Sequence, residues 1–180
     1  MASGTMTERA PLPPPDSPIP RRTEQDLPPY RYVPGLLPHP FRHEGGHMYT
    51  DGSAPTEDPW VPQARPSEDI RFCYAADLFD QRFYWEAHEA WEAMWHSAED
   101  GTAVRDLLQS LIQYAASALQ HHMGHQRGST SLLTRADDRL KPWRADLGDL
   151  IYGVDTGRVL TEMKTLLAGG DWPLIGNIRP

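Results

Sequence analysis

Prolines divide the chain into two parts that cannot share one kind of secondary structure. Of the 18 prolines, 15 lie in residues 1–66, and none lies in residues 67–141. Proline fixes φ and removes a backbone N–H donor, so the first third of the chain cannot form regular helices or central strands. The proline-free stretch can form them. We therefore predict a domain boundary near Pro66.

The proline-rich part consists of two segments of different composition. Residues 1–28 contain many prolines and few large apolar side chains, which is typical of a disordered, solvated tail. Residues 29–66 are different, because large apolar side chains are spread among their prolines. Burial of such groups stabilises contact with a folded domain, so we expect an extended arm that packs on the rest of the protein. These side chains are Tyr30, Tyr32, Val33, Leu36, Leu37, Phe41, Tyr49 and Trp60.

After Pro66, apolar residues recur at three- and four-residue spacing, which is the periodicity of amphipathic helices. Ser67 can cap the start of the first helix with its hydroxyl group. The two acids that follow it are stabilised by the positive end of the helix dipole. Pro142 should end or bend the fourth helix. The predicted helices span about residues 68–81, 84–98 and 103–123, a fourth capped by Ser129 or Ser131, a short one after residue 147, and a last one around 159–167.

Short loops between helices favour antiparallel neighbours. We therefore predict an all-α fold, a small antiparallel bundle of about five helices with an extended Pro-rich N-terminal arm. The predicted organisation is a disordered tail at 1–28, the packed arm at 29–66, the helical domain at 67–170 and a C-terminal tail at 171–180.

Charge and hydropathy exclude several classes of partner. The formal net charge is −8, and an acidic surface repels phosphate backbones, so we expect no nucleic-acid partner. No apolar run reaches the ~20 residues of a membrane span, and the N-terminus lacks the apolar segment of a secretory signal. A single cysteine, Cys73, excludes an internal disulfide. Together these features predict a cytoplasmic protein without a membrane partner.

The helix expected at 84–98 carries several titratable side chains within two turns. On a helical wheel, Trp91 and Trp95 face the core, whereas His88 and Glu92 lie four residues apart at the border between core and solvent. Trp85 faces the polar side. The candidate ligand pocket therefore consists of Trp85, Glu86, His88 and Glu92, with Gln113 from the next helix.

A metal site is one interpretation of this helix. The segment from His88 to Glu92 has the form H-E-x-x-E, which resembles the H-E-x-x-H of zinc peptidases, where the outer residues bind the ion and the inner Glu is the general base. By this analogy His88 and Glu92 are candidate ligands of zinc, iron or manganese, and Glu89 is the candidate catalytic base. A third ligand would come from His121, His122 or His125 near the end of the following helix, and His122, which falls on the apolar stripe of that helix, is the candidate.

The simpler interpretation is structural. In that case Glu86 and Glu89 are solvated, and His88 and Glu92 hydrogen-bond to neighbouring helices. Two arm histidines, His39 and His47, could reach the carboxylates of this helix, although mobile loop histidines without a ligand are the ordinary expectation.

The sequence resembles a bacterial family catalogued as domain of unknown function 309, over about residues 68–140. The segment from Tyr30 to His47 is similar to an extension found in some members. The resemblance implies an all-helical bundle and no established activity, substrate or cofactor. It rests on Asp77-Leu78-Phe79, on Tyr84 through Glu92 with Trp95, on Leu111 through Ala116, and on Gly124, Arg127 and Gly128.

The sequence thus predicts a non-catalytic binding or scaffold protein with a polar His/Glu/Trp cluster on its second helix. The aromatic arm is a candidate for an intramolecular or homodimer interface. Two alternatives stay open, a metal-dependent hydrolase-like enzyme that uses the H-E-x-x-E segment and a protein with a small-molecule-binding pocket.

Overall fold

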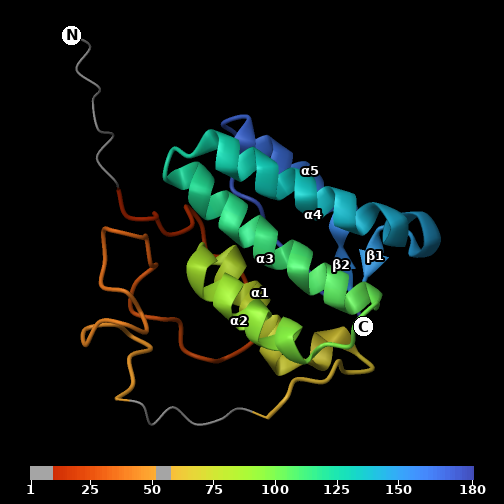
Figure 1. The fold of residues 1–180 in the computed structure, drawn as a ribbon, viewed down its shortest axis with the longest axis horizontal. Helices are drawn as coiled ribbons and strands as arrows, with labels where there is room; N and C mark the ends of the chain where they lie inside the picture. Colours follow the sequence, from red (N-terminus) through yellow and green to blue (C-terminus); the bar gives the residue numbers. More distant parts are fainter. Residues whose placement is uncertain (1–9, 52–57) are drawn as a thin grey trace.

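A computed structural model describes residues 10–51 and 58–180 (Figure 1). The first nine residues of the predicted tail and residues 52–57 of the predicted arm lie outside the described ranges. The prediction of an all-α bundle of about five helices is confirmed. The elements are η1 (Pro66–Glu68), α1 (Ile70–Asp80), α2 (Tyr84–Ser97), α3 (Ala103–His122), α4 (Gln126–Leu147), β1 (Leu150–Ile151), β2 (Val154–Asp155) and α5 (Thr156–Leu167).

The predicted bounds of the first three helices are close to those observed. The first α-helix starts later than expected, at Ile70, because Asp69 caps it by accepting a hydrogen bond from the Phe72 amide, and η1 precedes this cap. Thr102 caps α3 in the same way through the Arg105 amide. None of the helices in the described residues is both long and apolar enough to cross a bilayer.

The C-terminal third differs from the prediction in three places. Helix α4 starts at Gln126 with His125 as its N-cap, and not at Ser129 or Ser131. The fourth helix continues through Pro142 to Leu147, because Pro142 is exposed and the next residue, Trp143, donates its indole N–H to Asp106 Oδ2 of α3 at 2.8 Å. The expected short helix after residue 147 is a two-strand hairpin instead. Its turn residues, Tyr152 and Gly153, have φ values of 43° and 72°, the pair of positive values that a type I′ turn requires.

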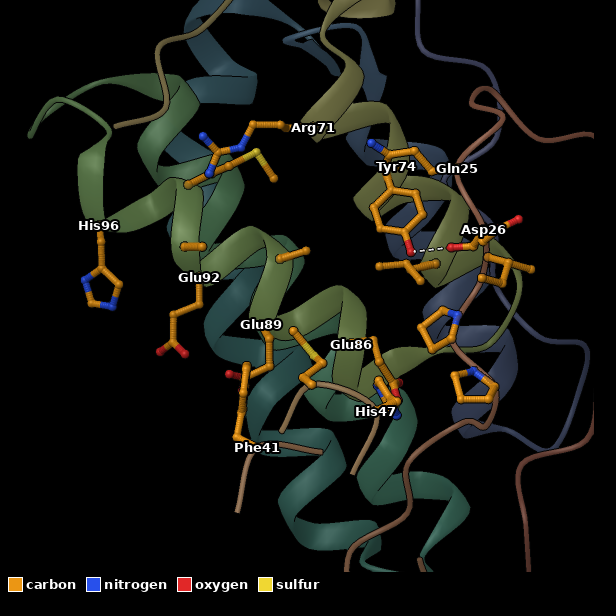
Figure 2. Close-up of a pocket in the computed structure, with 18 of the residues that line it drawn as sticks. Gln25, Asp26, Phe41, His47, Arg71, Tyr74, Glu86, Glu89, Glu92 and His96 are labelled. Atoms are coloured by element: carbon orange, nitrogen blue, oxygen red, sulfur yellow. Dashed lines mark hydrogen bonds and ion pairs between the residues drawn. The ribbon is translucent and has the colours of Figure 1, made fainter. Parts of the chain in front are cut away.

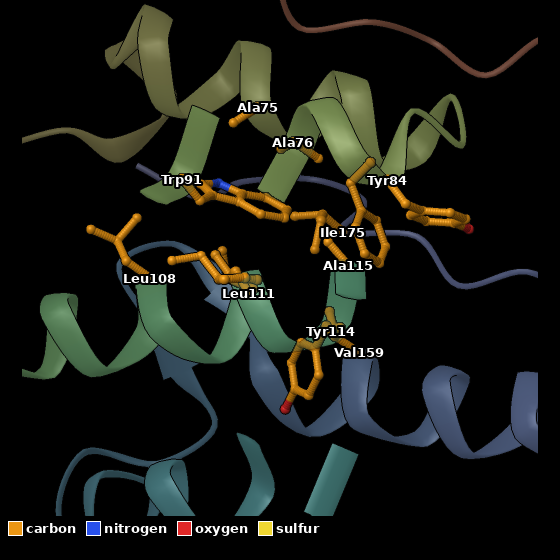
Figure 3. Packing of buried hydrophobic residues seen from close by; sticks show 14 of the residues in the cluster. Ala75, Ala76, Tyr84, Trp91, Leu108, Leu111, Tyr114, Ala115, Val159 and Ile175 are labelled. Carbon is orange, nitrogen blue, oxygen red and sulfur yellow. The ribbon is translucent and has the colours of Figure 1, made fainter. Parts of the chain in front are cut away.

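The helices pack in the order of the chain, α1 on α2, α2 on α3 and α3 on α4, with α5 on the far side (Figure 1). Trp91 of α2 is fully buried, as predicted, and lies between Ala76 of α1 and Leu111 of α3 (Figure 3). Trp95 is only partly buried, and the Arg105 guanidinium lies 4.4 Å from its ring centroid. The core therefore fixes the position of α2 against both of its neighbours.

The described part of the predicted disordered tail, residues 10–28, lies against the bundle. The guanidinium of Arg22 pairs with two acids of α1, at 2.8 Å from Asp77 Oδ1 and 2.6 Å from Asp80 Oδ2. Asp77 and Asp80 are 1 % and 2 % exposed, so each needs a charged partner to remain ionised. Asp80 also accepts the amide of Ile175 at 2.5 Å. These two carboxylates therefore hold both ends of the described chain to α1.

Replacing Arg22 by Ala should lower the free energy of unfolding by about 3–5 kcal/mol, because two buried carboxylates lose their counter-ion. Urea denaturation of the full chain measures this change. Arg65→Ala is the matched control, since Arg65 pairs with Glu68 on the surface, where both side chains are more than half exposed, and its effect should stay within about 1 kcal/mol. Equal, small effects of both substitutions would contradict this account of the tail.

Candidate functional site

A pocket of about 1230 Å³ lies between α1, α2 and the proline-rich segment (Figure 2). The wall residues follow helical spacing on both helices, which places them on the facing sides of α1 and α2. Residues 25–29, 41, 47 and 48 of the N-terminal segment supply the opposite wall. The helical residues are Arg71, Tyr74 and Leu78 of α1, and Glu86, Glu89, Ala90, Glu92, Ala93, Met94 and His96 of α2.

Glu86 lies in the first turn of α2 and is 3 % exposed, contrary to the interpretation that it is solvated. Its Oε1 accepts the amide of Tyr32 at 3.0 Å, and its Oε2 has no hydrogen-bond partner among the described residues. Burial raises the pKa of Glu86 to about 7, and backbone hydrogen bonds from Glu86 itself and from Tyr32, together with the charge of Arg31, offset this only in part. The wall of the pocket thus contains a carboxyl group that titrates near neutral pH.

His47 of the arm faces Glu86, with its Nε2 3.5 Å from Glu86 Oε1 and its side chain 7 % exposed (Figure 2). Neither ring nitrogen has a hydrogen-bond partner within the described ranges. Burial lowers the pKa of His47, which favours the neutral imidazole. Burial therefore disfavours the charged form of both side chains in this contact, the Glu86 carboxylate and the His47 imidazolium.

The arm loop that positions His47 is tightly closed. A Cβ atom at Gly46 would lie 2.2 Å from the Pro40 carbonyl oxygen and 2.4 Å from that of His39, so only glycine fits this approach. The Tyr30 hydroxyl donates to Pro38 O at 2.8 Å. The Tyr30 ring packs edge-on against the His47 ring, with 4.5 Å between the two ring centroids. Of the two interpretations of the arm histidines, the structure matches the one that brings His47 to the helix.

A second group of polar side chains lies on the exposed edge of α2. His88, Glu89 and Glu92 each offer a ligand atom, and these atoms lie within 4.8 Å of one another. His88 Nε2 is 3.8 Å from Glu92 Oε2, and its Nδ1 is 3.3 Å from Ile112 O of α3. Burial raises the pKa of Glu89, which the neighbouring Glu92 also favours and His88 opposes. This arrangement could hold a divalent cation, with the Ile112 carbonyl orienting the imidazole.

The structure does not bring His122 to this group. Its Nε2 lies 2.7 Å from Ala10 O, and its ring centroid is 6.1 Å from that of Trp172. His122 is ten residues beyond Ile112 on α3, which at 1.5 Å per residue corresponds to roughly 15 Å along the helix. The third side chain beside His88 and Glu92 is Glu89, the residue predicted as a catalytic base.

Of the predicted pocket residues, only Glu86 and Glu92 line the observed pocket, together with Glu89. The arm covers Trp85, whose ring lies 5.1 Å from Tyr32, 5.5 Å from His39 and 5.5 Å from Phe41. Gln113 and His88 lie outside the pocket wall. Most other wall residues were not predicted, among them Tyr74 of α1 and Phe41 and Met48 of the arm. Helical spacing could have indicated Tyr74. The apolar composition of the arm predicts that Phe41 packs on the domain, but no sequence signal indicates which part of the domain it contacts.

Comparison with known proteins identifies part of this framework. The family model described as Domain of unknown function (DUF309) matches residues 72–132, from α1 to the first turns of α4. No curated protein and no solved structure matches the chain. The predicted family resemblance is confirmed over residues 72–132, the part of the chain that is similar to the DUF309 family.

Proposed function

We propose that this chain is a binding protein whose pocket between the arm, α1 and α2 takes a small molecule. The observation that supports this most directly is Glu86, a buried carboxyl group on the pocket wall with one oxygen that lacks a hydrogen-bond partner among the described residues. Buried polar groups in folded proteins are almost always paired. A group left unpaired and with a strongly shifted pKa is typical of a functional site.

The size and lining of the pocket also favour a small-molecule ligand. Pockets for such ligands typically have volumes of ~300–1,000 Å³ and combine an apolar lining with a few polar groups. The present volume of about 1230 Å³ is large enough for a drug-sized molecule. Apolar contact comes from Leu27, Phe41 and Met48, and Glu86 and His47 are the polar groups at one end.

Filling the pocket tests this function. Ala93 of α2 lines the pocket and is exposed, so Ala93→Trp should occupy the space without disturbing the core. In ligand-observed NMR with a library of small organic molecules, we expect binders of the native chain whose signal is lost in Ala93→Trp. Ala145→Trp on α4, also at an exposed helical position, should retain them. The proposal fails if Ala93→Trp weakens the binding of none of these molecules.

A divalent-metal site is the second candidate, because His88, Glu89 and Glu92 converge on α2. If a metal occupies this group, it would be bound by one imidazole and two carboxylates, a ligand set that suits zinc, iron or manganese. Any metal-dependent hydrolysis would then require a base other than Glu89, since Glu89 is needed as a ligand.

Thermal denaturation with Zn²⁺, Mn²⁺ and Fe²⁺ tests the metal site. A cation present at 100 times its Kd should stabilise the folded chain by ~2.7 kcal/mol. We expect His88→Ala to abolish this stabilisation, whereas Glu86→Gln, in the neighbouring pocket, should retain it. The site is excluded if none of the cations stabilises the native chain, or if they stabilise His88→Ala to the same extent.

A further inference from the structure

The carboxyl groups around the pocket give it a strongly acidic lining. Five carboxyl groups line the pocket, but only one guanidinium group does. That guanidinium belongs to Arg71, and it donates to the backbone oxygen of Asp58 at 2.9 Å. The lining therefore favours a cationic ligand over a neutral or anionic one. The five carboxyl groups belong to Asp26, Asp58, Glu86, Glu89 and Glu92.

The most buried of these carboxyl groups contrasts with the acids that bind the N-terminal tail. Asp77 and Asp80 face the guanidinium of Arg22, whereas Glu86 faces the imidazole of His47. A neutral imidazole offers one acceptor nitrogen, and a carboxylate offers acceptors only. Glu86 Oε1 accepts the Tyr32 amide, whereas Glu86 Oε2 and the acceptor nitrogen of His47 have no donor among the described residues. The two side chains are 2 % and 7 % exposed.

The group that matches these acceptors is an ammonium, which has three N–H donors and no acceptor. Charge-assisted hydrogen bonds of this kind are roughly twice as strong as neutral ones. Glu89, one turn after Glu86 on α2, adds a second carboxyl group on the same side of the helix (Figure 2). A cation at this place would relieve the desolvation of both carboxylates.

The arm adds apolar surface next to the polar end of the pocket. Phe41 lies beside Glu89, and His47 beside Glu86 (Figure 2). Met48 follows His47, and Leu27 lies on the adjoining wall. These side chains provide room for a hydrocarbon group attached to the ammonium. They all precede residues 72–132, so the proposed site combines carboxylates of the family domain with a wall from outside it.

We propose that the pocket binds an organic ammonium ion, with its N–H groups donating to Glu86 and His47 and its hydrocarbon chain packed against Phe41 and Met48. This inference rests on the proposed binding function and assigns its ligand class. The site requires both the α2 carboxylates and the arm, because each supplies part of the contact to the cation.

Isothermal titration calorimetry with three six-carbon probes tests the ligand class on the full chain. The probes are hexylammonium, hexanol and hexanoate, which differ in charge and share the hydrocarbon chain. We expect hexylammonium to bind at least about tenfold more tightly than hexanol, and hexanoate to bind more weakly than either. Equal affinity for hexanol and hexylammonium overturns the ammonium assignment. The proposed binding function is tested separately, by whether Ala93→Trp loses the molecules from the library that bind the native chain.

Variants locate the cation. Glu86→Gln should weaken hexylammonium binding by about ten- to hundredfold, which is the range for loss of one charge-assisted hydrogen bond. Glu89→Gln should weaken it less. Glu68→Gln, on the exposed surface, should leave it unchanged. Far-ultraviolet circular dichroism verifies that each variant is folded. Hexylammonium binding that survives both Glu86→Gln and Glu89→Gln would show that the cation lies elsewhere.

Discussion

The contact between Glu86 and the arm is the interaction on which the rest of this account depends. Glu86 is fixed by its place in the first turn of α2, and α2 is fixed by Trp91 in the core. The arm covers the carboxyl group, donates one backbone amide from Tyr32, and brings His47 to 3.5 Å. Desolvation of the carboxyl group is therefore a consequence of docking the arm, and without that docking α2 would present an ordinary surface glutamate.

The N-terminal segment is anchored to the bundle in two chemically different ways. At Asp77 and Asp80 the anchor is an ion pair with Arg22, in which a guanidinium compensates buried carboxylates. At Glu86 the arm supplies an imidazole whose pKa is itself lowered by burial. The first arrangement stabilises the fold. The second leaves a carboxyl group undercompensated on a pocket wall, which costs stability and is understandable if a ligand completes it.

Local sequence patterns predict the helices well and the segments between them poorly. Periodicity predicted α1, α2 and α3 closely, because each buries one face of a proline-free stretch. Pro142 misled the prediction, since a proline at an exposed helical position leaves the helix intact when tertiary contacts such as Trp143–Asp106 hold the next turn. The Tyr152–Gly153 hairpin was missed because a non-glycine residue occupies a positive-φ position.

The sequence indicated the carboxylates of the helix and one arm residue, His47, and left the rest of the site undetermined. The wheel grouped Glu86, Glu89 and Glu92, and all three line the pocket. The helical wheel could not show which of the three is buried, because contact with the arm determines that Glu86 is buried. His47 reaches Glu86 through the close approach of Gly46 to the backbone of Pro40, a contact between loop segments that no periodicity encodes. Conversely, His122 was assigned to the metal group from its residue type and its place on the apolar stripe of α3, and its distance along α3 separates it from His88.

The central claim is that Glu86 is buried without full compensation, and the pH dependence of stability tests it most directly. Burial raises the pKa of Glu86 from 4.5 to about 7, so the folded chain holds a proton that the unfolded chain releases in this range. Its contribution to the free energy of unfolding is therefore full below pH 4.5 and falls as the pH rises to 7. Glu86→Gln cannot ionise and should escape this loss.

The measurement is urea denaturation of the native chain and of Glu86→Gln at pH 5 and pH 8, with Glu68→Gln as the exposed control. His47 titrates with the opposite sign and lies 3.5 Å from Glu86, so the difference between the native chain and Glu86→Gln reports the coupled pair, in which Glu86 has the predicted sign. Between pH 5 and pH 8, we predict that the free energy of unfolding of Glu86→Gln rises by on the order of 3 kcal/mol relative to that of the native chain. The same difference for Glu68→Gln should be close to zero. A Glu86→Gln variant that is destabilised at pH 8, or that shows the same pH dependence as the native chain, would contradict the account.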